Sequence, residues 1–281
     1  MTLRRKSISD LQDALPSPSG RKQAMARNFS RAALSYDSAA YIQKETAQEL
    51  AQSIAELSLG AGAEVLEIGC GTGFLGAALA AVLPGANFLF TDISPNMIHQ
   101  CRLKLAGVLD QAQFAVMDGE NLALDRRFDL ITGSLSFQWF DNPMETLERL
   151  AGLLKGQGVL AFATIGVDSL HEWRSAVSSL GAEYESIIPT FPSAADLASA
   201  FPDSSLVVRE KSKSVRYDSA RDFLDGLKCI GALTTQSGEA ILSSGQLRAL
   251  LRRLDEVDAG NDGFSVTHNI LFGQYRRGEI S

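Results

Sequence analysis

The chain has 281 residues and a net charge of −7 at pH 7, and 45% of its residues are hydrophobic. That hydrophobic content is ordinary for a globular protein, and the acidic balance argues against general binding of nucleic acid, because phosphate contacts need a basic surface. No apolar run reaches the roughly 20 residues of a membrane helix, and the polar start lacks the apolar segment of a secretory signal. Three cysteines without CxxC spacing indicate reduced thiols. We therefore expect a monomeric, cytoplasmic protein with no membrane or nucleic-acid partner.

The N-terminal part predicts a flexible tail and then a helix. Residues 1–24 are polar and contain the segment Pro16-Ser17-Pro18-Ser19-Gly20, so we expect a tail there and one α/β domain over 25–281. A helix over about 39–57 is indicated by an apolar stripe at helical spacing, formed by Ile42, Ala47, Leu50 and Ile54.

The next segment predicts a strand, a glycine-rich loop and a helix in immediate succession. The strand and loop read Val65-Leu66-Glu67-Ile68-Gly69-Cys70-Gly71-Thr72-Gly73, and the helix covers about 74–83. Such a loop opens the nucleotide-binding unit of α/β proteins, because glycines adopt backbone angles closed to other residues and let a cofactor approach the backbone. Cys70 is a small residue that would pack beneath the cofactor.

Alternating strands and helices continue as far as residue 164. We expect strands over 87–91, 113–116, 127–134 and 159–164, and helices over 95–105 and 143–154. Ser94 and Pro95 suit the N-cap and the first turn of the helix over 95–105. This alternation indicates a central, mostly parallel sheet with helices on both faces.

Three carboxylates belong to this pattern. Glu67 stands two positions before the first glycine of the loop. Asp92 ends the second strand, 25 residues after Glu67, where an α/β nucleotide site places the carboxylate that accepts the ribose hydroxyls. Asp118 lies in an acidic turn after the third strand, from which a carboxylate can reach an adenine amino group.

Two cofactors and one structural alternative fit the glycine loop. Gly71-x-Gly73-x-x-Gly76 matches the dinucleotide fingerprint, although a lone match of this kind is weak. The negative charge of Glu67 suits a cationic cofactor better than a pyrophosphate, which favours S-adenosylmethionine (SAM). A glycine-rich structural turn with unrelated surface acids is the third alternative.

Between about residues 63 and 165 these motifs together resemble class I SAM-dependent methyltransferases. The resemblance implies a Rossmann-like α/β fold and SAM as cofactor, with S-adenosylhomocysteine (SAH) as its product. The cofactor-binding residues that it implies are Glu67, Gly69, Cys70, Gly71, Gly73, Asp92, Ile93, Met97, Asp118, Gly119 and Ser134.

Beyond residue 165 the alternation ends. Residues 166–205 predict a helical insertion, with pieces around 170–180 and 193–200, which we expect to form part of a cap over the substrate end of the sheet. A basic strand over 206–216, helices over about 219–231 and 244–257, and a strand over 264–276 complete the chain. Strand alternation places Arg209, Lys211 and Lys213 on one face. That face is either a solvated edge guarded against aggregation or a docking surface.

Segments outside the cofactor motifs carry a second resemblance. They are the Phe29-x-x-Ala32-x-x-x-Tyr36 element, the Gln138-Trp139 pair, Leu227-Lys228-Cys229-Ile230-Gly231-Ala232 and Phe264-Ser265-Val266-Thr267-His268. From about residue 27 to 275 the chain resembles the malonyl-acyl-carrier-protein O-methyltransferases of biotin synthesis. This implies methyl transfer from SAM to the free carboxylate of a malonyl thioester on acyl carrier protein or on coenzyme A.

The second resemblance also implies roles for single residues. Tyr36, alternatively a structural aromatic, would orient the malonyl carboxylate or SAM. Lys228, alternatively a lysine that reaches solvent, would meet the malonyl carboxylate or the pantetheine phosphate. Both are our candidates for the catalytic machinery. The residues that we expect to contact the acceptor or its carrier are Trp139, Arg174, Arg209, Lys211, Lys213 and His268.

The proposed chemistry requires no strong base, because a carboxylate is already ionised at pH 7. Three scattered histidines provide no set of metal ligands, so we expect no metal site. Two alternative functions remain. One is a SAM-dependent methyltransferase acting on another small carboxylic acid or small molecule, and the other is a non-catalytic subunit of the same fold that binds a partner protein.

Overall fold

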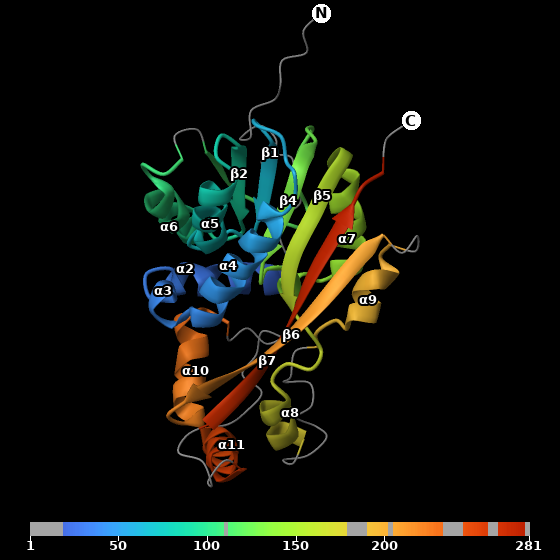
Figure 1. Ribbon diagram of the computed structural model, residues 1–281. Helices are drawn as coiled ribbons and strands as arrows, with labels where there is room; N and C mark the ends of the chain where they lie inside the picture. Colours follow the sequence, from blue (N-terminus) through green and yellow to red (C-terminus); the bar gives the residue numbers. More distant parts are fainter. Residues whose placement is uncertain are drawn as a thin grey trace, which may run out of the picture.

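A computed structural model of the protein describes residues 19–109, 112–178, 190–201, 205–232, 244–257 and 264–278. Within these residues seven strands form one sheet in the order β3-β2-β1-β4-β5-β7-β6 (Figure 1). In chain order the strands are β1 (Glu64–Ile68), β2 (Asn87–Asp92), β3 (Gln113–Val116), β4 (Phe128–Ser134), β5 (Leu154–Ile165), β6 (Leu206–Tyr217) and β7 (Phe264–Arg276).

The first five strands pair in parallel, whereas β7 runs antiparallel to both β5 and β6. This confirms the predicted central, mostly parallel sheet. The strand order reverses direction between β1 and β4. Strand β1 pairs with β2 on one side and with β4 on the other, so Val65 lies between Phe88 and Leu130. In open α/β sheets ligands bind at the carboxyl ends of the strands beside such a reversal.

Helices cover both faces of the sheet, as expected. Helices α4 (Tyr41–Ala55), α5 (Phe74–Val82) and α6 (Pro95–Leu105) pack on the face to which Val65 contributes, and α7 (Pro143–Gly152) and α9 (Ala194–Ser199) pack on the face of Leu66. Neighbouring residues of a strand point to opposite faces of the sheet, so one apolar strand contributes side chains to the cores on both faces. The predicted helix start at Ser94 is confirmed, because its hydroxyl accepts a hydrogen bond from the Met97 N–H at 3.2 Å.

The last two strands extend beyond the rest of the sheet and carry a separate group of helices (Figure 1). Helices α8 (His171–Ser178), α10 (Ala220–Cys229) and α11 (Ser244–Val257) enclose a third core with the start of β7, which contributes Phe264 and Val266. Helices α2 (Gly20–Ala32) and α3 (Tyr36–Ala39) lie near the carboxyl ends of the parallel strands instead.

Several boundaries differ from the predictions. The expected tail over 1–24 ends earlier, because α2 begins at Gly20 with Ser19 as its N-cap; residues 1–18 lie outside the described residues. Helix α4 is shorter than 39–57. Strand β5 starts at Leu154 rather than 159, so Gly156 and Gly158 lie within the strand. None of the helices that the structure describes combines the length and apolar character needed to span a bilayer.

Candidate functional site

The glycine loop joins β1 to α5 at the carboxyl end of the sheet. Gly69 has φ +66°, and a Cβ atom there would lie 2.5 Å from the Cβ of Ser136 in the loop after β4. Only glycine satisfies both conditions without displacing the neighbouring loop. The loop backbone and the end of β4 therefore meet closely, and this contact shapes the floor of the site.

Asp92, at the end of β2, holds the glycine loop through its backbone. One carboxylate oxygen accepts a hydrogen bond from Gly71 N at 3.0 Å, and the other accepts from Ser94 N at 2.8 Å. Burial raises the pKa of Asp92 to about 6, although these two backbone donors act in the opposite direction. Each oxygen retains a lone pair, so the ionised carboxylate can accept further hydrogen bonds from a ligand's hydroxyl groups.

Glu67, in β1, is almost completely buried, and its Oε2 atom has no hydrogen-bond partner within the described part of the chain. Burial, followed by the charge of Asp92, raises the pKa of Glu67 well above its ordinary value. A buried, unpartnered carboxylate is costly unless a cation or a donor accompanies it. Glu67 thus favours a positively charged ligand near the glycine loop.

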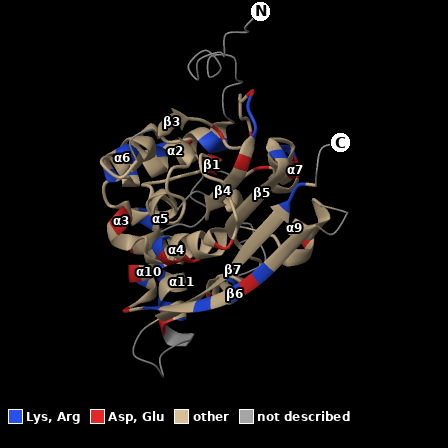
Figure 2. Cartoon of the chain, turned by 45° about the horizontal axis from the view of Figure 1, so that its top comes forward, with Lys and Arg blue, Asp and Glu red and all other residues tan. Residues whose placement is uncertain are grey.

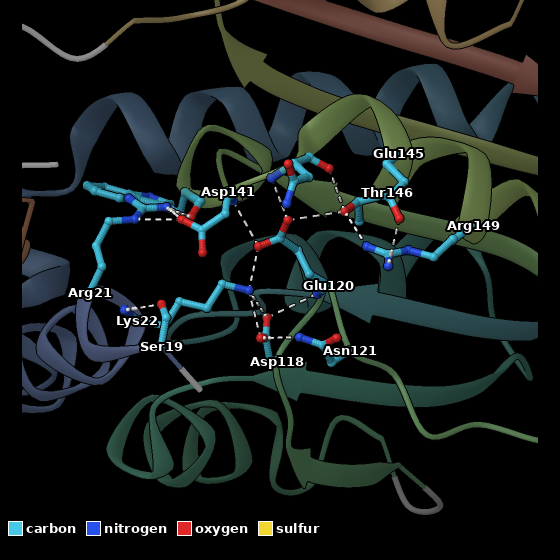
Figure 3. Close-up of polar contacts among 12 residues, drawn as sticks. Ser19, Arg21, Lys22, Asp118, Glu120, Asn121, Asp141, Glu145, Thr146 and Arg149 are labelled. Carbon is cyan, nitrogen blue, oxygen red and sulfur yellow. Dashed lines mark hydrogen bonds and ion pairs between the residues drawn. The ribbon is translucent and has the colours of Figure 1, made fainter. Parts of the chain in front are cut away.

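Asp118, in the turn after β3, is already contacted by the N-terminal helix. Lys22 Nζ, from α2, donates to both carboxylate oxygens of Asp118, at 2.8 and 2.7 Å, and also pairs with Glu120 (Figure 3). The sequence reading missed Lys22, because it placed this residue in a tail. The only local signal was the resemblance of the segment that follows it, from Phe29 to Tyr36.

These groups surround one cavity at the carboxyl ends of β1 to β4, which we call the central cavity. Its free volume is about 80 Å³. The lining residues that the sequence predicted are Tyr36, Gly69, Gly71, Asp92, Ile93, Met97, Asp118, Gly119, Ser134 and Trp139, and those that it missed are Lys22, Met25, Phe29, Ile68, Met117, Leu135, Ser136 and Phe140. Glu67, Cys70 and Gly73 lie behind this lining rather than in it.

The N-terminal helices form the outer wall of the central cavity. The ring of Phe29, in α2, meets the edge of Trp139 with 5.3 Å between centroids, and Tyr36, in α3, lies 6.3 Å from the ring of Phe74. Of the described residues between 166 and 205, none lines the cavity. Helices α2 and α3 therefore provide the cover of this cavity within the described residues, whereas α9 packs into the core through Leu197. The cap expected from residues 166–205 stays a prediction.

Tyr36 points a neutral phenol into the central cavity. Its pKa is raised above the ordinary value, first by burial and then by the charges of Asp92 and Asp37. The hydroxyl therefore stays protonated at physiological pH and can donate a hydrogen bond to an anionic substrate.

Lys228 does not reach the central cavity. It ends α10, where its ammonium group bonds to Asp225 at 2.7 Å and remains about half exposed. It lines a second depression of about 350 Å³, the α2–α10 groove, whose other lining residues are Asn28, Arg31, Ala32, Ser35, Cys229 and Gly231. Gly231 shapes this groove: its φ is +72°, and a Cβ atom there would lie 3.0 Å from the carbonyl oxygen of Asn28. Lys228 therefore lies outside the lining of the central cavity, and its expected contact with the malonyl carboxylate or the pantetheine phosphate stays a prediction.

The residues expected to contact the carrier are dispersed. Arg209 and Lys211 share one face of β6, as predicted, but both pair with Glu49 of α4, at 2.8 and 2.6 Å. Lys213 pairs with Glu45 of the same helix. Figure 2 shows β6 at the edge of the sheet with basic and acidic residues along it.

Two further predicted residues lie away from the central cavity. Arg174 donates to the carbonyl oxygens of Val167 and Ser169, at 3.1 and 3.4 Å, and so fastens the start of α8. His268 is buried in β7, and burial lowers its pKa to about 4. Neither side chain lines the central cavity, and their expected contact with the acceptor or its carrier stays a prediction.

The donor set of the central cavity fits SAM. The hydroxyl oxygens of Ser134 and Ser136 are buried and have no hydrogen-bond partner within the described residues, and both residues line the cavity. Together with the unpartnered Oε2 of Glu67 behind the lining, they leave polar groups that a ligand can satisfy. Asp92 and Asp118 lie at the ends of adjacent strands, where a nucleoside can be held at its ribose and at its base.

Known proteins resemble both the sequence and the fold. A family model described as a methyltransferase domain matches residues 66–160. A malonyl-[acyl-carrier protein] O-methyltransferase of Magnetococcus marinus is 38% identical over 92% of this chain and 93% of its own. The biotin biosynthesis bifunctional protein BioCD of Bordetella avium is 37% identical over 91% of this chain and 52% of its own length.

Solved methyltransferase structures share the fold at low identity. The plantazolicin methyltransferase BpumL, solved in complex with SAH, has a TM-score of 0.52 at 17% identity and covers 96% of this chain and 98% of its own. An N-methyltransferase of Haemonchus contortus, also solved with SAH, has a TM-score of 0.56 at 14% identity over 94% of this chain and 62% of its own. These likenesses concern the fold alone.

Proposed function

Because the chain belongs to the malonyl-[acyl-carrier protein] O-methyltransferase family and has the class I SAM-dependent methyltransferase fold, we propose that it methylates the free carboxylate of a malonyl thioester on acyl carrier protein. This reaction is an early step of biotin synthesis, and its methyl donor is SAM. The family membership excludes the dinucleotide and the purely structural explanations of the glycine loop.

The observation that carries the proposal is the meeting of Asp92, Asp118 and Tyr36 in one cavity. SAM supplies an electrophilic methyl group on a sulfonium sulfur when it is bound. Asp92 accepts hydrogen bonds from the ribose hydroxyls, and Asp118 accepts one from the adenine amino group. Glu67 stands behind the glycine loop, where its charge favours a cationic ligand over a pyrophosphate.

The chain's contribution to the transfer is alignment and exclusion of water rather than proton removal. The malonyl carboxylate is already an anion, so it attacks through oxygen without a base. Tyr36 donates a hydrogen bond from its neutral phenol to the acceptor and fixes its direction. The aromatic wall formed by Phe29, Trp139 and Phe140 keeps water from the reacting atoms.

The α2–α10 groove is our candidate site for the pantetheine arm. Neighbouring residues of the N-terminal segment line the groove and the central cavity in turn. Asn28 lines the groove and Phe29 the central cavity, and in the same way Ser35 lines the groove and Tyr36 the central cavity. A pantetheine arm bound in the groove is therefore separated from the central cavity by one thin wall, formed by the N-terminal segment. Arg31 and Lys228 supply positive charge for the phosphate of the arm, so we assign Lys228 to the phosphate rather than to the malonyl carboxylate.

The basic face of β6 remains a candidate surface for the carrier protein itself. Within the described part of the chain its three cations pair with two carboxylates, those of Glu45 and Glu49, so this group of side chains keeps a positive balance. An acidic carrier protein is attracted to such a surface, and charges of this exposed kind act mainly on the association rate.

A methyl-transfer assay with isotopically labelled SAM tests the proposal. Malonyl carrier protein, malonyl-coenzyme A and free malonate are compared as acceptors, and we expect the carrier thioester to be preferred and free malonate to be nearly inert. Preference for free malonate would favour the small-acid alternative. Failure to bind SAH by calorimetry would favour the non-catalytic alternative. Rescue of a biotin-requiring bacterial strain that lacks its own methyltransferase tests the pathway independently.

A further inference from the structure

Lys22 is a buried lysine whose ammonium group lies inside the cofactor region. Its side chain is 5% exposed, and those of its partners Asp118 and Glu120 are 9% and 4% exposed. Figure 3 shows the ammonium between the two carboxylates, at the point where α2 approaches the turn after β3. Burying these charges is costly unless they stay paired, so this contact fixes α2 to the turn.

The two carboxylates have different surroundings. Glu120 accepts hydrogen bonds from the backbone N–H groups of Asp141 and Asn142, at 2.9 and 2.7 Å, at the start of α7. The carboxylate of Glu120 is therefore held by these backbone N–H groups on the side away from Lys22. Asp118 lines the central cavity, so it is the carboxylate that faces a ligand.

Asp118 has no acceptor position to spare in this arrangement. Besides the two contacts from Lys22, it accepts hydrogen bonds from Glu120 N at 3.0 Å and from Asn121 Nδ2 at 2.9 Å. These four contacts, from three donor groups, match the roughly four acceptor positions of a carboxylate. An adenine amino group therefore needs one of the positions that Lys22 occupies. Lys22 can release one oxygen of Asp118, because its two remaining hydrogens then bond to the other oxygen of Asp118 and to Glu120.

We propose that Lys22 is a positioning residue for the cofactor: it holds Asp118 in place for the adenine amino group and anchors helix α2 over the bound nucleoside. The inference rests on the proposed function, because it takes SAM as the cofactor. It adds a residue of the N-terminal helix to the recognition of the base. Specificity for adenine then depends on α2 being docked.

The attachment of α2 has a second point that supports this coupling. Arg21 bonds to Asp141 at 2.7 Å and to the carbonyl oxygen of Trp139 at 2.8 Å. Helix α2 is therefore attached beside the central cavity at two consecutive residues, Arg21 and Lys22.

Calorimetric binding of two ligands tests the role of Lys22. The ligands are SAH and S-inosylhomocysteine, in which a carbonyl oxygen replaces the adenine amino group. The proteins are the parent, Lys22→Met, Lys22→Arg and the matched control Arg27→Met, which removes one positive charge from an exposed position of the same helix. Binding needs no methyl acceptor, so the identity of the acceptor does not enter the result.

The parent should prefer SAH by roughly 10- to 100-fold, the value of a charge-assisted hydrogen bond. Lys22→Met should bind SAH about tenfold or more weakly and retain less than about threefold preference. Lys22→Arg, which keeps the charge, should recover part of the preference, and Arg27→Met should resemble the parent. Should Lys22→Met not fold, Lys22→Met/Glu120→Gln, which removes one charge of each sign, should show the same loss of preference.

Three results would overturn the inference. They are an unchanged preference in Lys22→Met, equal losses for both ligands, and tighter binding of SAH, which would make Lys22 a competitor of adenine. A parent that binds neither ligand would refute the proposed cofactor instead.

Discussion

The hydroxyl of Thr72, in the glycine loop, donates a hydrogen bond of 2.6 Å to the carboxylate of Asp37, in helix α3. Lys104 of α6 reinforces this link, because its ammonium lies 2.7 Å from Asp37 and 3.1 Å from Thr72. Asp37 follows Tyr36 directly, so the loop that shapes the cofactor site also holds the helix that carries the phenol. The glycine loop and the position of Tyr36 are therefore linked through the contact between Thr72 and Asp37.

Replacing Tyr36 with phenylalanine should impair turnover far more than folding. The change removes only a hydroxyl, which faces the central cavity, while the ring keeps its contact with Phe74. We expect kcat to fall about 10-fold or more, with the melting temperature and the SAH affinity near those of the parent. Tyr41→Phe, at an exposed tyrosine, is the matched control. An unchanged kcat in Tyr36→Phe would make the residue purely structural.

The affinity for SAH should depend on the ionisation of Asp92. Its pKa is about 6 in the folded protein and 3.8 ordinarily, so the folded state holds this proton more tightly between these values. The ionised carboxylate accepts from the ribose hydroxyls, and the affinity should therefore rise as pH increases through 6. Asp92→Asn should bind SAH roughly 10- to 100-fold more weakly and should lose this rise. Calorimetry at pH 5, 6 and 7.5 provides the test; a parallel rise in the variant would assign it to another group.

The same shift affects stability with the opposite sign. Because the folded state binds the Asp92 proton more tightly, its contribution to the free energy of unfolding decreases as pH rises from about 4 to 6. Without cofactor, the free energy of unfolding of Asp92→Asn should therefore decrease less over this pH range than that of the parent.

Two double variants separate binding of the arm from docking of the carrier. Arg31→Glu/Lys228→Glu changes the α2–α10 groove, and Lys211→Gln/Lys213→Gln changes the basic face of β6. The groove variant should raise KM for every acceptor that has a pantetheine phosphate, namely malonyl carrier protein and malonyl-coenzyme A. The strand variant should raise KM about threefold for the carrier protein alone.

Malonyl-N-acetylcysteamine, a thioester without phosphate, is the control acceptor for both variants. Its KM should be the same in both variants as in the parent. Added salt should weaken the parent's use of the carrier protein more than that of the strand variant, because screening acts on an attraction that the variant has lost. If the strand variant lost activity equally with all acceptors, β6 would support the cavity through α4 rather than dock the carrier.

His268 should make the protein sensitive to acid. Burial lowers its pKa from 6.5 to about 4; the charge of Glu172 opposes this shift and that of Lys213 adds to it. Between these values the unfolded chain binds more protons, so the free energy of unfolding falls as pH decreases. His268→Gln should reduce the loss between pH 7 and 5 by roughly 2 kcal/mol in urea unfolding. His99→Gln, at an exposed histidine, should leave the loss as in the parent.

The sequence by itself determined the elements whose signals are local. The strand, glycine loop and helix from Val65 onward, the N-cap at Ser94 and the carboxylate at the end of β2 all lie where their patterns predict. Local patterns succeed here because a buried parallel strand, a capped helix and a left-handed glycine are each defined by a few adjacent residues. Asp92 could be assigned a role because strand ends converge at one edge of the sheet.

Only the tertiary structure decided which cations pair and which segment covers the site. Lys22 and Asp118 are 96 residues apart in the chain, and Arg209 and Glu49 are 160 apart, so no local pattern records either contact. Lys22 looked like part of a polar tail, although its helix forms the outer wall of the central cavity. A charged side chain acquires its role from the partner with which it is buried, and that partner is known only once the chain has folded.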